Sequence, residues 1–182
     1  YATTFIFTGL AVAVAIHAGL FNIGGEGQAT LGGIGVALVA LWLGAKLPAV
    51  VMLPLLVVAS AVFGMLWAAL PAYLQAWRGS HIVITTIMFN FLAAGLNGYL
   101  LVNWLRPAGS MAVESADFAE SARMPALHQM AAAFGIELPS SPLNLSLVIA
   151  LVACVFVSWF LWKSAAGYAV RAVGSAPRAA HY

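Results

Sequence analysis

The sequence is poor in charged residues of either sign. Its 182 residues include only seven Lys or Arg and five Asp or Glu, so 7% of the chain is charged. An average soluble domain has roughly 25% charged residues. So few charges cannot cover the surface of a soluble globule of this size. The net charge of +2 is also too small and too dispersed to indicate nucleic-acid binding.

The chain also lacks the residues and motifs that catalysis and metal binding require. Its one cysteine, Cys154, lies in an apolar run and cannot form an intrachain disulfide. The sequence has no Cys/His metal spacing, no Walker A sequence and no G-x-S-x-G motif. We therefore predict no catalytic residue, no metal site and no cofactor on this chain.

Long apolar runs are what the sequence has in abundance. Hydrophobic residues make up 64% of the chain, and the mean hydropathy is +1.01. Five runs approach or exceed the roughly 20 residues that a membrane-spanning helix needs. They do not alternate as the strands of a membrane barrel would. We therefore predict an all-α, polytopic bundle in one transmembrane domain, with spans at about 3–20, 28–43, 48–77, 81–104 and 145–162.

Residues 106–144 separate the last two predicted spans and contain four acidic residues. We predict a long extramembrane loop there, with a short helix near Ala126–Phe134. Arg78 and the basic residues after position 162 lie on one side of the membrane, and the Lys/Arg count of four against three favours that side as cytoplasmic. The loop would then be extracytoplasmic. Whether the 28–43 segment spans or is re-entrant stays open.

The stretch 19–28 combines three glycines in four residues with Glu26, the only acidic residue near the spans. Broken helices with polar side chains recur at transporter substrate sites, and backbone groups freed there need protein or water partners. Two interpretations have equal weight: a broken helix at a translocation path, or an interfacial turn with a solvated Glu26. Asn22 and Gln28 flank it as further candidates for the path or for polar packing. Close helix packing is predicted for the next glycines, Gly32, Gly33 and Gly35.

A polar stripe crosses the fourth predicted span. Thr86, Asn90 and Asn97 are spaced so that they share one helical face. Such a stripe either makes hydrogen bonds between helices or lines a pathway. For Thr86, bonding back to its own helix is slightly favoured. The asparagines need partners, because an unpaired amide in lipid is costly.

The cytoplasmic segment 163–182 has three basic residues and no acidic one. It could be a basic tail at anionic lipid head groups. Its glycines and proline also divide it into short pieces, one of which has enough apolar surface to dock into a groove on a soluble partner.

Three stretches together resemble one family. They are Leu-Phe-Asn-Ile-Gly-Gly-Glu-Gly-Gln at 20–28, Pro-Ala-Tyr-Leu-Gln-Ala-Trp-Arg-Gly at 71–79 with Val-Ile-Thr-Thr-Ile-Met-Phe-Asn at 83–90, and Gly-Tyr-Ala-Val-Arg-Ala-Val-Gly-Ser-Ala-Pro-Arg-Ala-Ala at 167–180. In this order they resemble the ABC importer permeases of the branched-chain amino acid, ribose and nucleoside group, in the simple-sugar and nucleoside branch.

The resemblance implies a permease of about eight to ten spans in the bacterial inner membrane, of which this chain would be a fragment. It implies a homo- or heterodimeric pair of permease subunits, a separate ATPase subunit that binds the ATP, and an extracytoplasmic solute-binding protein. The expected ATPase-coupling residues are Gly167, Arg171, Gly174, Pro177 and Arg178.

Two other classes remain as alternatives. An ATP-independent secondary transporter or channel would use Glu26 as its coupling residue. A membrane enzyme would need a convergent polar cluster, and the spans have few candidates for one.

Overall fold

The computed structural model describes residues 2–133, 135–136 and 139–176. Within these ranges the regular structure is helical, apart from one isolated antiparallel bridge between Ala126 and Asn144. The chain divides into two compact units. One comprises Ile23–Arg123, and the other comprises Tyr1–Asn22 together with Met124–Tyr182.

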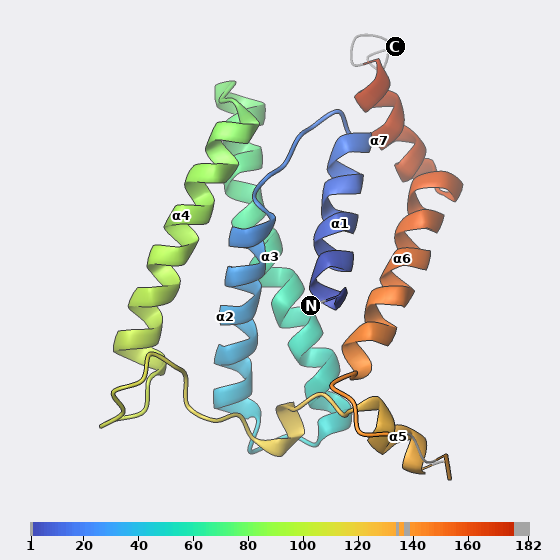
Figure 1. Cartoon of the computed structure of the whole chain (residues 1–182). Coiled ribbons are helices and arrows are strands. Elements are labelled where there is room, and N and C mark those ends of the chain that lie inside the picture. Colours follow the sequence, from blue (N-terminus) through green and yellow to red (C-terminus); the bar gives the residue numbers. More distant parts are fainter. Residues whose placement is uncertain (1, 134, 137–138, 177–182) are drawn as a thin grey trace. The chain divides into compact units, whose positions relative to one another are not determined.

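The Ile23–Arg123 unit is built on three long helices, which lie side by side in Figure 1. They are α2 (Gly25–Leu43), α3 (Ala49–Arg78) and α4 (Ile82–Leu100). A short turn joins α2 to α3. The end of α4 widens into a π-helical segment, η1 (Leu101–Leu105), which continues the same helix.

Glycines allow α2 to approach α3 closely. A Cβ atom added at Gly32 would lie 2.9 Å from Ser60 Oγ, and one at Gly35 would lie 2.6 Å from the Phe63 ring. Close packing through small residues is thereby confirmed at these two positions. At Gly33 the described residues show no such packing, because none of their atoms lies within 4 Å of an added Cβ. Gly33 lies on a different face of α2, which opens onto a groove.

The first half of the predicted extracytoplasmic loop is not fully exposed to solvent. Phe118 and Ala122 pack against a buried cluster of Ala40, Met52 and Leu56 at one end of α2 and α3. Ala122 ends a short 3-10 helix, η2 (Glu120–Ala122). The neighbouring Ser121 hydroxyl donates a hydrogen bond to the Gly44 carbonyl oxygen, which ties the loop to the end of α2.

The second unit contains α1 (Ala2–His17), α5 (Leu127–Ala133), α6 (Leu145–Lys163) and α7 (Ala165–Ser175). The short helix α5 confirms the prediction near Ala126–Phe134 as far as Ala133; Phe134 lies outside the described residues. The Asn144 side chain begins α6 by accepting a hydrogen bond from the Ser146 N–H at 3.1 Å.

Four described helices are long and apolar enough to cross a membrane by length and composition: α2, α3, α4 with η1, and α6. The all-α, polytopic prediction is confirmed. The segment predicted at 28–43 is one continuous helix of 19 residues that begins at Gly25. The first predicted span contains the helix Ala2–His17 among the described residues.

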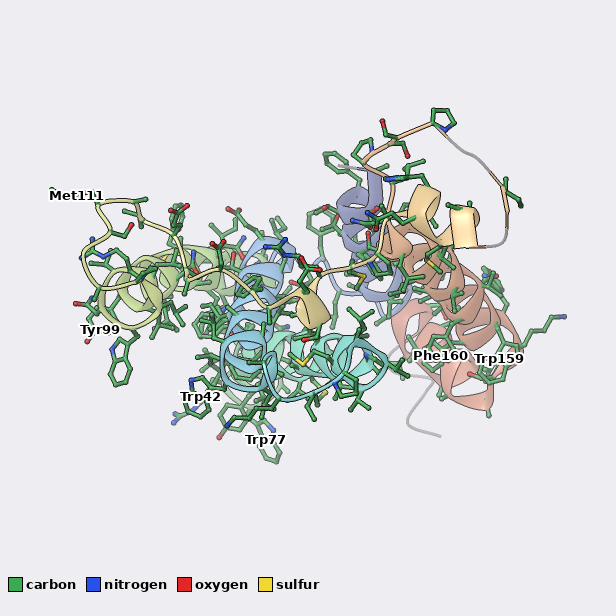
Figure 2. All side chains as sticks on the ribbon, turned by 90° about the horizontal axis from the view of Figure 1, so that it is seen from below. Trp42, Trp77, Tyr99, Met111, Trp159 and Phe160 are labelled. Carbon is green, nitrogen blue, oxygen red and sulfur yellow. The ribbon has the colours of Figure 1, made fainter. Side chains whose placement is uncertain are left out.

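Large aromatic side chains lie at the ends of the long helices and point outward, as Figure 2 shows for Trp42 and Trp77. The exposed fractions of Trp42, Trp77 and Trp104 are 76%, 77% and 75%. Amphipathic aromatic rings at helix ends are typical of the two membrane–water interfaces.

Candidate functional site

The segment between α1 and α2 is the first candidate site. The chain leaves the helical path after His17 and resumes it at Gly25. The predicted helix break is therefore present, but it lies upstream of Gly25 and Gly27, which both belong to the first turn of α2. The N-cap residue of α2, Gly24, supplies no side-chain cap.

Asn90 of α4 supplies that missing cap from another helix. Its Oδ1 accepts a hydrogen bond from the Gly27 N–H at 2.9 Å, and its Nδ2 donates to the Ile23 carbonyl oxygen at 3.0 Å. One side chain thus pairs two backbone groups that no regular helix bond satisfies. Of the two roles predicted for the polar stripe, hydrogen bonding between helices is present at Asn90.

Thr86 lies one turn earlier on the same face of α4 and is only 1% exposed. Its hydroxyl donates to the Ile82 carbonyl oxygen of its own helix at 2.8 Å, which is the predicted back-bonding. The same oxygen accepts a long hydrogen bond from the Ile23 N–H at 3.4 Å. Both backbone groups of Ile23 are therefore held by α4.

Gly27 is a glycine because α4 and α3 approach it closely. An added Cβ would lie 2.9 Å from Asn90 Oδ1 and 3.0 Å from Trp67 Nε1. The Trp67 ring also packs edge-on against Phe89, with ring centroids 5.4 Å apart. Its buried indole N–H has no hydrogen-bond partner among the described residues. Sequence reasoning missed Trp67, because nothing in an apolar run shows which tryptophan faces a glycine turn.

The other predicted residues of this site differ in exposure. Glu26 is exposed, and in the described part of the chain its carboxylate has no ion-pair partner. Gln28 and Asn22 are half-buried. Asn97 lies further along α4, on the wall of a groove between α2 and α4.

The second candidate site is the junction of α6 and α7, which one serine forms. The Ser164 hydroxyl donates to the Phe160 carbonyl oxygen at 2.7 Å and accepts from the Gly167 N–H at 2.9 Å. It therefore closes the end of α6 and caps the start of α7. Gly167 is buried in this corner, and a Cβ there would collide with the Phe160 carbonyl oxygen.

Arg171 points back onto the end of α6. Its Nε–H donates to the Leu161 carbonyl oxygen at 2.9 Å, and its guanidinium carbon lies 4.5 Å from the centre of the Trp162 ring. A cation at a helix C-terminus and over an aromatic face is stabilising on both counts. His17, at the end of α1, packs edge-on against the same Trp162 ring at 5.8 Å. The ring thus joins α1, α6 and α7.

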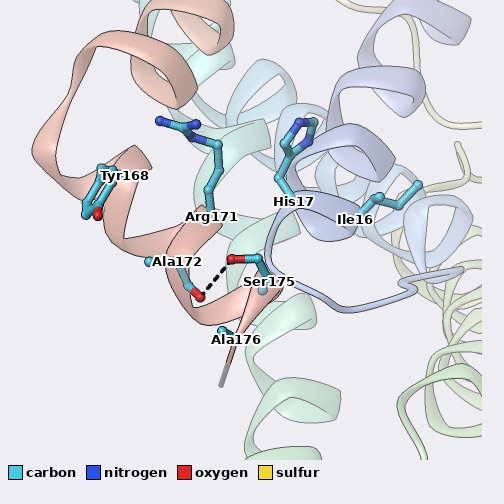
Figure 3. Close-up of a pocket in the computed structure, with 8 residues that line it drawn as sticks. Ile16, His17, Tyr168, Arg171, Ala172, Ser175 and Ala176 are labelled. Atoms are coloured by element: carbon cyan, nitrogen blue, oxygen red, sulfur yellow. Dashed lines mark hydrogen bonds between the residues drawn. The ribbon is translucent and has the colours of Figure 1, made fainter. Parts of the chain in front are cut away.

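Gly174 makes the closest approach of α7 to α1. A Cβ at Gly174 would collide with the His17 carbonyl oxygen and lie 2.7 Å from the Gly19 backbone nitrogen. Gly19 itself has a φ of +73°, which favours glycine. Beside this contact lies an open pocket of about 620 Å³, lined by the end of α1 and by α7 (Figure 3).

The predicted coupling residues divide into two groups. Gly167, Arg171 and Gly174 lie against α6 and α1, where they hold α7 in place. Pro177 and Arg178 lie outside the described residues. The large apolar side chains of α7 that are exposed are Tyr168 and Val173, at 67% and 50%. Among the described residues, no group of three or more His, Cys, Asp or Glu could hold a metal ion.

Comparison with known proteins places these features in one family. Residues 1–182 match the family described as "Branched-chain amino acid transport system / permease component". The chain is 36% identical over 182 residues to the guanosine ABC transporter permease protein of Bacillus subtilis, with 99% of this chain and 49% of that protein covered.

Two further relatives have similar coverage. The chain is 36% identical over 180 residues to a glucose ABC transporter permease protein of Haloferax volcanii, covering 98% of this chain and 47% of that protein. It is 33% identical over 185 residues to a nucleoside ABC transporter permease protein of Lactococcus lactis, covering 97% and 48%. The chain thus spans about half the length of these curated relatives. No solved structure matches it.

Proposed function

Because this chain belongs to the permease-component family of the branched-chain amino acid transport systems, we propose that it is part of the permease subunit of an ATP-driven importer. The transported solute is a simple sugar or a nucleoside, and the membrane is the plasma membrane. The three relatives, which are named as permeases for guanosine, glucose and nucleosides, support this solute class. Four helices of membrane-spanning length support the multi-pass arrangement.

The observation that carries the proposal is α7. It is a short amphipathic helix directly after the apolar helix α6, and Ser164 alone separates the two. Gly167, Arg171 and Gly174 contact α6 and α1, while the side chains of Tyr168 and Val173 are exposed. An amphipathic helix of this kind fits a groove on a soluble partner. We assign that partner as the ATPase subunit, which supplies the nucleotide site that this sequence lacks.

From the contacts of α7 we infer a route by which motion of the ATPase subunit reaches the membrane helices. Its Gly174 abuts the last turn of α1 and Gly19, so a displaced α7 must move the end of α1. The next residues of the chain lead to Ile23, whose N–H and carbonyl oxygen are both held by α4. Closure of the ATPase subunits would therefore displace the end of α1 through the contact of α7 with His17 and Gly19.

The proposal requires further subunits. A second permease subunit, identical or different, would complete the pathway, and an extracytoplasmic solute-binding protein would deliver the solute. The segment 106–123, which covers one end of α2 and α3, faces that binding protein in the predicted orientation. ATP binds to the partner subunit, and no cofactor is proposed for this chain.

Substitution of an exposed α7 residue tests the proposal. We expect Val173→Asp in the full-length permease to abolish ATPase copurification and ATP-driven uptake of guanosine or glucose, while membrane insertion is retained. The matched control is Val113→Asp, because Val113 is 62% exposed in the loop on the predicted opposite side. Undiminished copurification and uptake with Val173→Asp would contradict the assignment of α7.

The second candidate function is an ATP-independent secondary transporter or channel. It is favoured by Glu26, an exposed carboxylate in the first turn of α2 without an ion-pair partner in the described residues. In that case uptake would persist without any ATPase subunit and would be lost in Glu26→Gln. Uptake that depends on the ATPase and survives Glu26→Gln would exclude this candidate.

A further inference from the structure

A groove lies between α2 and α4 on the face that Gly33 leaves open. Its volume is about 280 Å³, and its walls come from α2, the end of α4, η1 and the loop residue Ser115. This volume lies near the lower limit of ordinary ligand pockets, which suits a small solute. Thr30 and Gly33 line it from α2, and Asn97 lines it from α4.

The polar groups of the groove are neutral and mostly hydrogen-bond acceptors. The Thr30 hydroxyl donates its proton to the Glu26 carbonyl oxygen at 2.9 Å, and the Ser115 hydroxyl donates to the Ala116 carbonyl oxygen at 3.2 Å. Both oxygens keep lone pairs that can accept. The Asn97 amide has no hydrogen-bond partner among the described residues, so two donors and one acceptor remain available there.

None of the nine residues that line the groove is charged. A zwitterionic amino acid would therefore find no partner for its carboxylate or its ammonium group, and burial of an unpaired charge is strongly unfavourable. A sugar or a ribose carries hydroxyl groups that both donate and accept, which matches the exposed oxygens and the free amide.

A distortion of the helix lies beside the same groove. Leu101 and Leu105 line it, and they begin and end the π-helical segment η1. π-Helical turns inside α-helices occur frequently at functional sites, because the wider turn displaces side chains and backbone from their regular positions. The unpaired Asn97 amide and the π-helical segment η1 therefore both line the same groove.

We propose that this groove binds an uncharged, hydroxyl-bearing solute during transport, with the Asn97 amide as its main hydrogen-bonding group. The inference rests on the proposed transport function and goes beyond it. It places the neutral, polyhydroxylated solute of that function in this groove, whose uncharged lining does not suit the branched-chain amino acids that the family description names.

Site-directed thiol labelling tests the proposal. Cys154 is the only cysteine of this sequence, so Gly33→Cys would be placed in a Cys154→Ser background of the full-length permease, with any cysteine elsewhere replaced, in lipid nanodiscs. An added side chain at Gly33 has open space. A charged methanethiosulfonate reagent reacts with thiolate in water and not with a thiol buried in lipid. We expect labelling of Gly33→Cys that guanosine or glucose slows and leucine does not.

Two controls sharpen the test. Gly95→Cys is matched to Gly33→Cys, because Gly95 is also exposed with open space but lies outside the groove. No solute should protect it. Asn97→Ala should raise the solute concentration for half-protection about tenfold, the loss expected for one hydrogen-bonding group. Asn103→Ala should leave it unchanged, because the Asn103 amide bonds to its own helix at Tyr99.

Three results would overturn the proposal. Absence of labelling at Gly33→Cys would mean that lipid or another helix covers the groove. Equal protection by leucine would contradict the neutral-solute assignment. Labelling that neither guanosine nor glucose slows would exclude solute binding. The labelling needs no ATP, so it decides about the groove even if ATP-driven uptake fails, and the two failures are distinguishable.

Discussion

Replacement of Asn90 by alanine is the sharpest test of how the α1–α2 segment is held. The change removes the hydrogen bond from the Gly27 N–H at 2.9 Å and the bond to the Ile23 carbonyl oxygen at 3.0 Å. Each bond contributes about 0.5–1.5 kcal/mol net, and a helix cap about 1 kcal/mol. We therefore expect Asn90→Ala to lower the free energy of unfolding by about 2 kcal/mol.

The assay is reversible unfolding of the full-length permease in mixed micelles of increasing denaturing detergent, followed by circular dichroism. A loss of about 2 kcal/mol corresponds to roughly a 30-fold change in the unfolding equilibrium constant. Asn103→Ala is the matched control. It removes one bond of 2.8 Å to Tyr99 within the same helix at an exposed position, so a change under about 0.5 kcal/mol is expected.

A double-mutant cycle with Gly27→Ala isolates the contact. An added Cβ at Gly27 would lie 2.9 Å from Asn90 Oδ1, so Gly27→Ala alone should cost about 1–3 kcal/mol. In the Asn90→Ala background the clashing oxygen is absent, and the two losses should sum to less than their separate values. A stability of Asn90→Ala within about 0.5 kcal/mol of the parent, or strictly additive losses, would refute the contact between Asn90 and Gly27.

Four further substitutions test the α6–α7 corner and the loop. Gly167→Ala should displace α7, because its Cβ would meet the Phe160 carbonyl oxygen; reduced ATPase copurification and a lower Tm would show it. Arg171→Lys should lower the free energy of unfolding by about 1 kcal/mol in thermal unfolding, because an ammonium group cannot stack on the Trp162 ring as a planar guanidinium does. The Arg171→Glu variant should still insert into the membrane but lose ATP-coupled uptake. Unchanged uptake in the Glu variant would contradict this. Ser121→Ala should free the loop from α2, seen as faster proteolysis with a loss of about 1 kcal/mol, and an unchanged digestion rate would argue against that contact.

The helices could be predicted well from the sequence because lipid imposes a strict rule. A backbone in hydrocarbon must satisfy its own polar groups, so each long apolar run becomes a helix. The run predicted at 48–77 is the helix Ala49–Arg78, and that predicted at 145–162 is Leu145–Lys163. The start of α2 was predicted three residues late, because glycines were read as helix breakers while Gly27 is required for close contact with α4.

The sequence showed which polar residues need hydrogen-bond partners, but it did not show which groups those partners are. An amide in an apolar run needs a partner, which identified Asn90 and Asn97 together. The sequence does not show that Asn90 pairs with the backbone of Ile23 and Gly27, while Asn97 is left with a groove. Those pairings join residues more than 60 positions apart in the chain.

Arg171 shows the same limit at the other site. The basic, glycine-interrupted segment indicated a short docking helix; a short helix, α7, is present there, and its docking stays a prediction. The sequence favoured Arg171 as a contact to the partner, whereas the fold turns its guanidinium onto Trp162 and the end of α6. The large apolar side chains of α7 that remain exposed are those of Tyr168 and Val173.

Scarcity of charge and length of apolar runs by themselves determined that this chain is a helical membrane protein, because those properties depend only on the solvent that each segment can tolerate. The ordered motifs indicated the family. Tertiary structure alone decided which glycine touches which helix, which amide is paired and which is free, and which face of α7 is exposed. These features depend on the rotation of each helix about its axis. Packing against neighbouring helices sets that rotation, and an almost uniformly apolar sequence does not encode it locally.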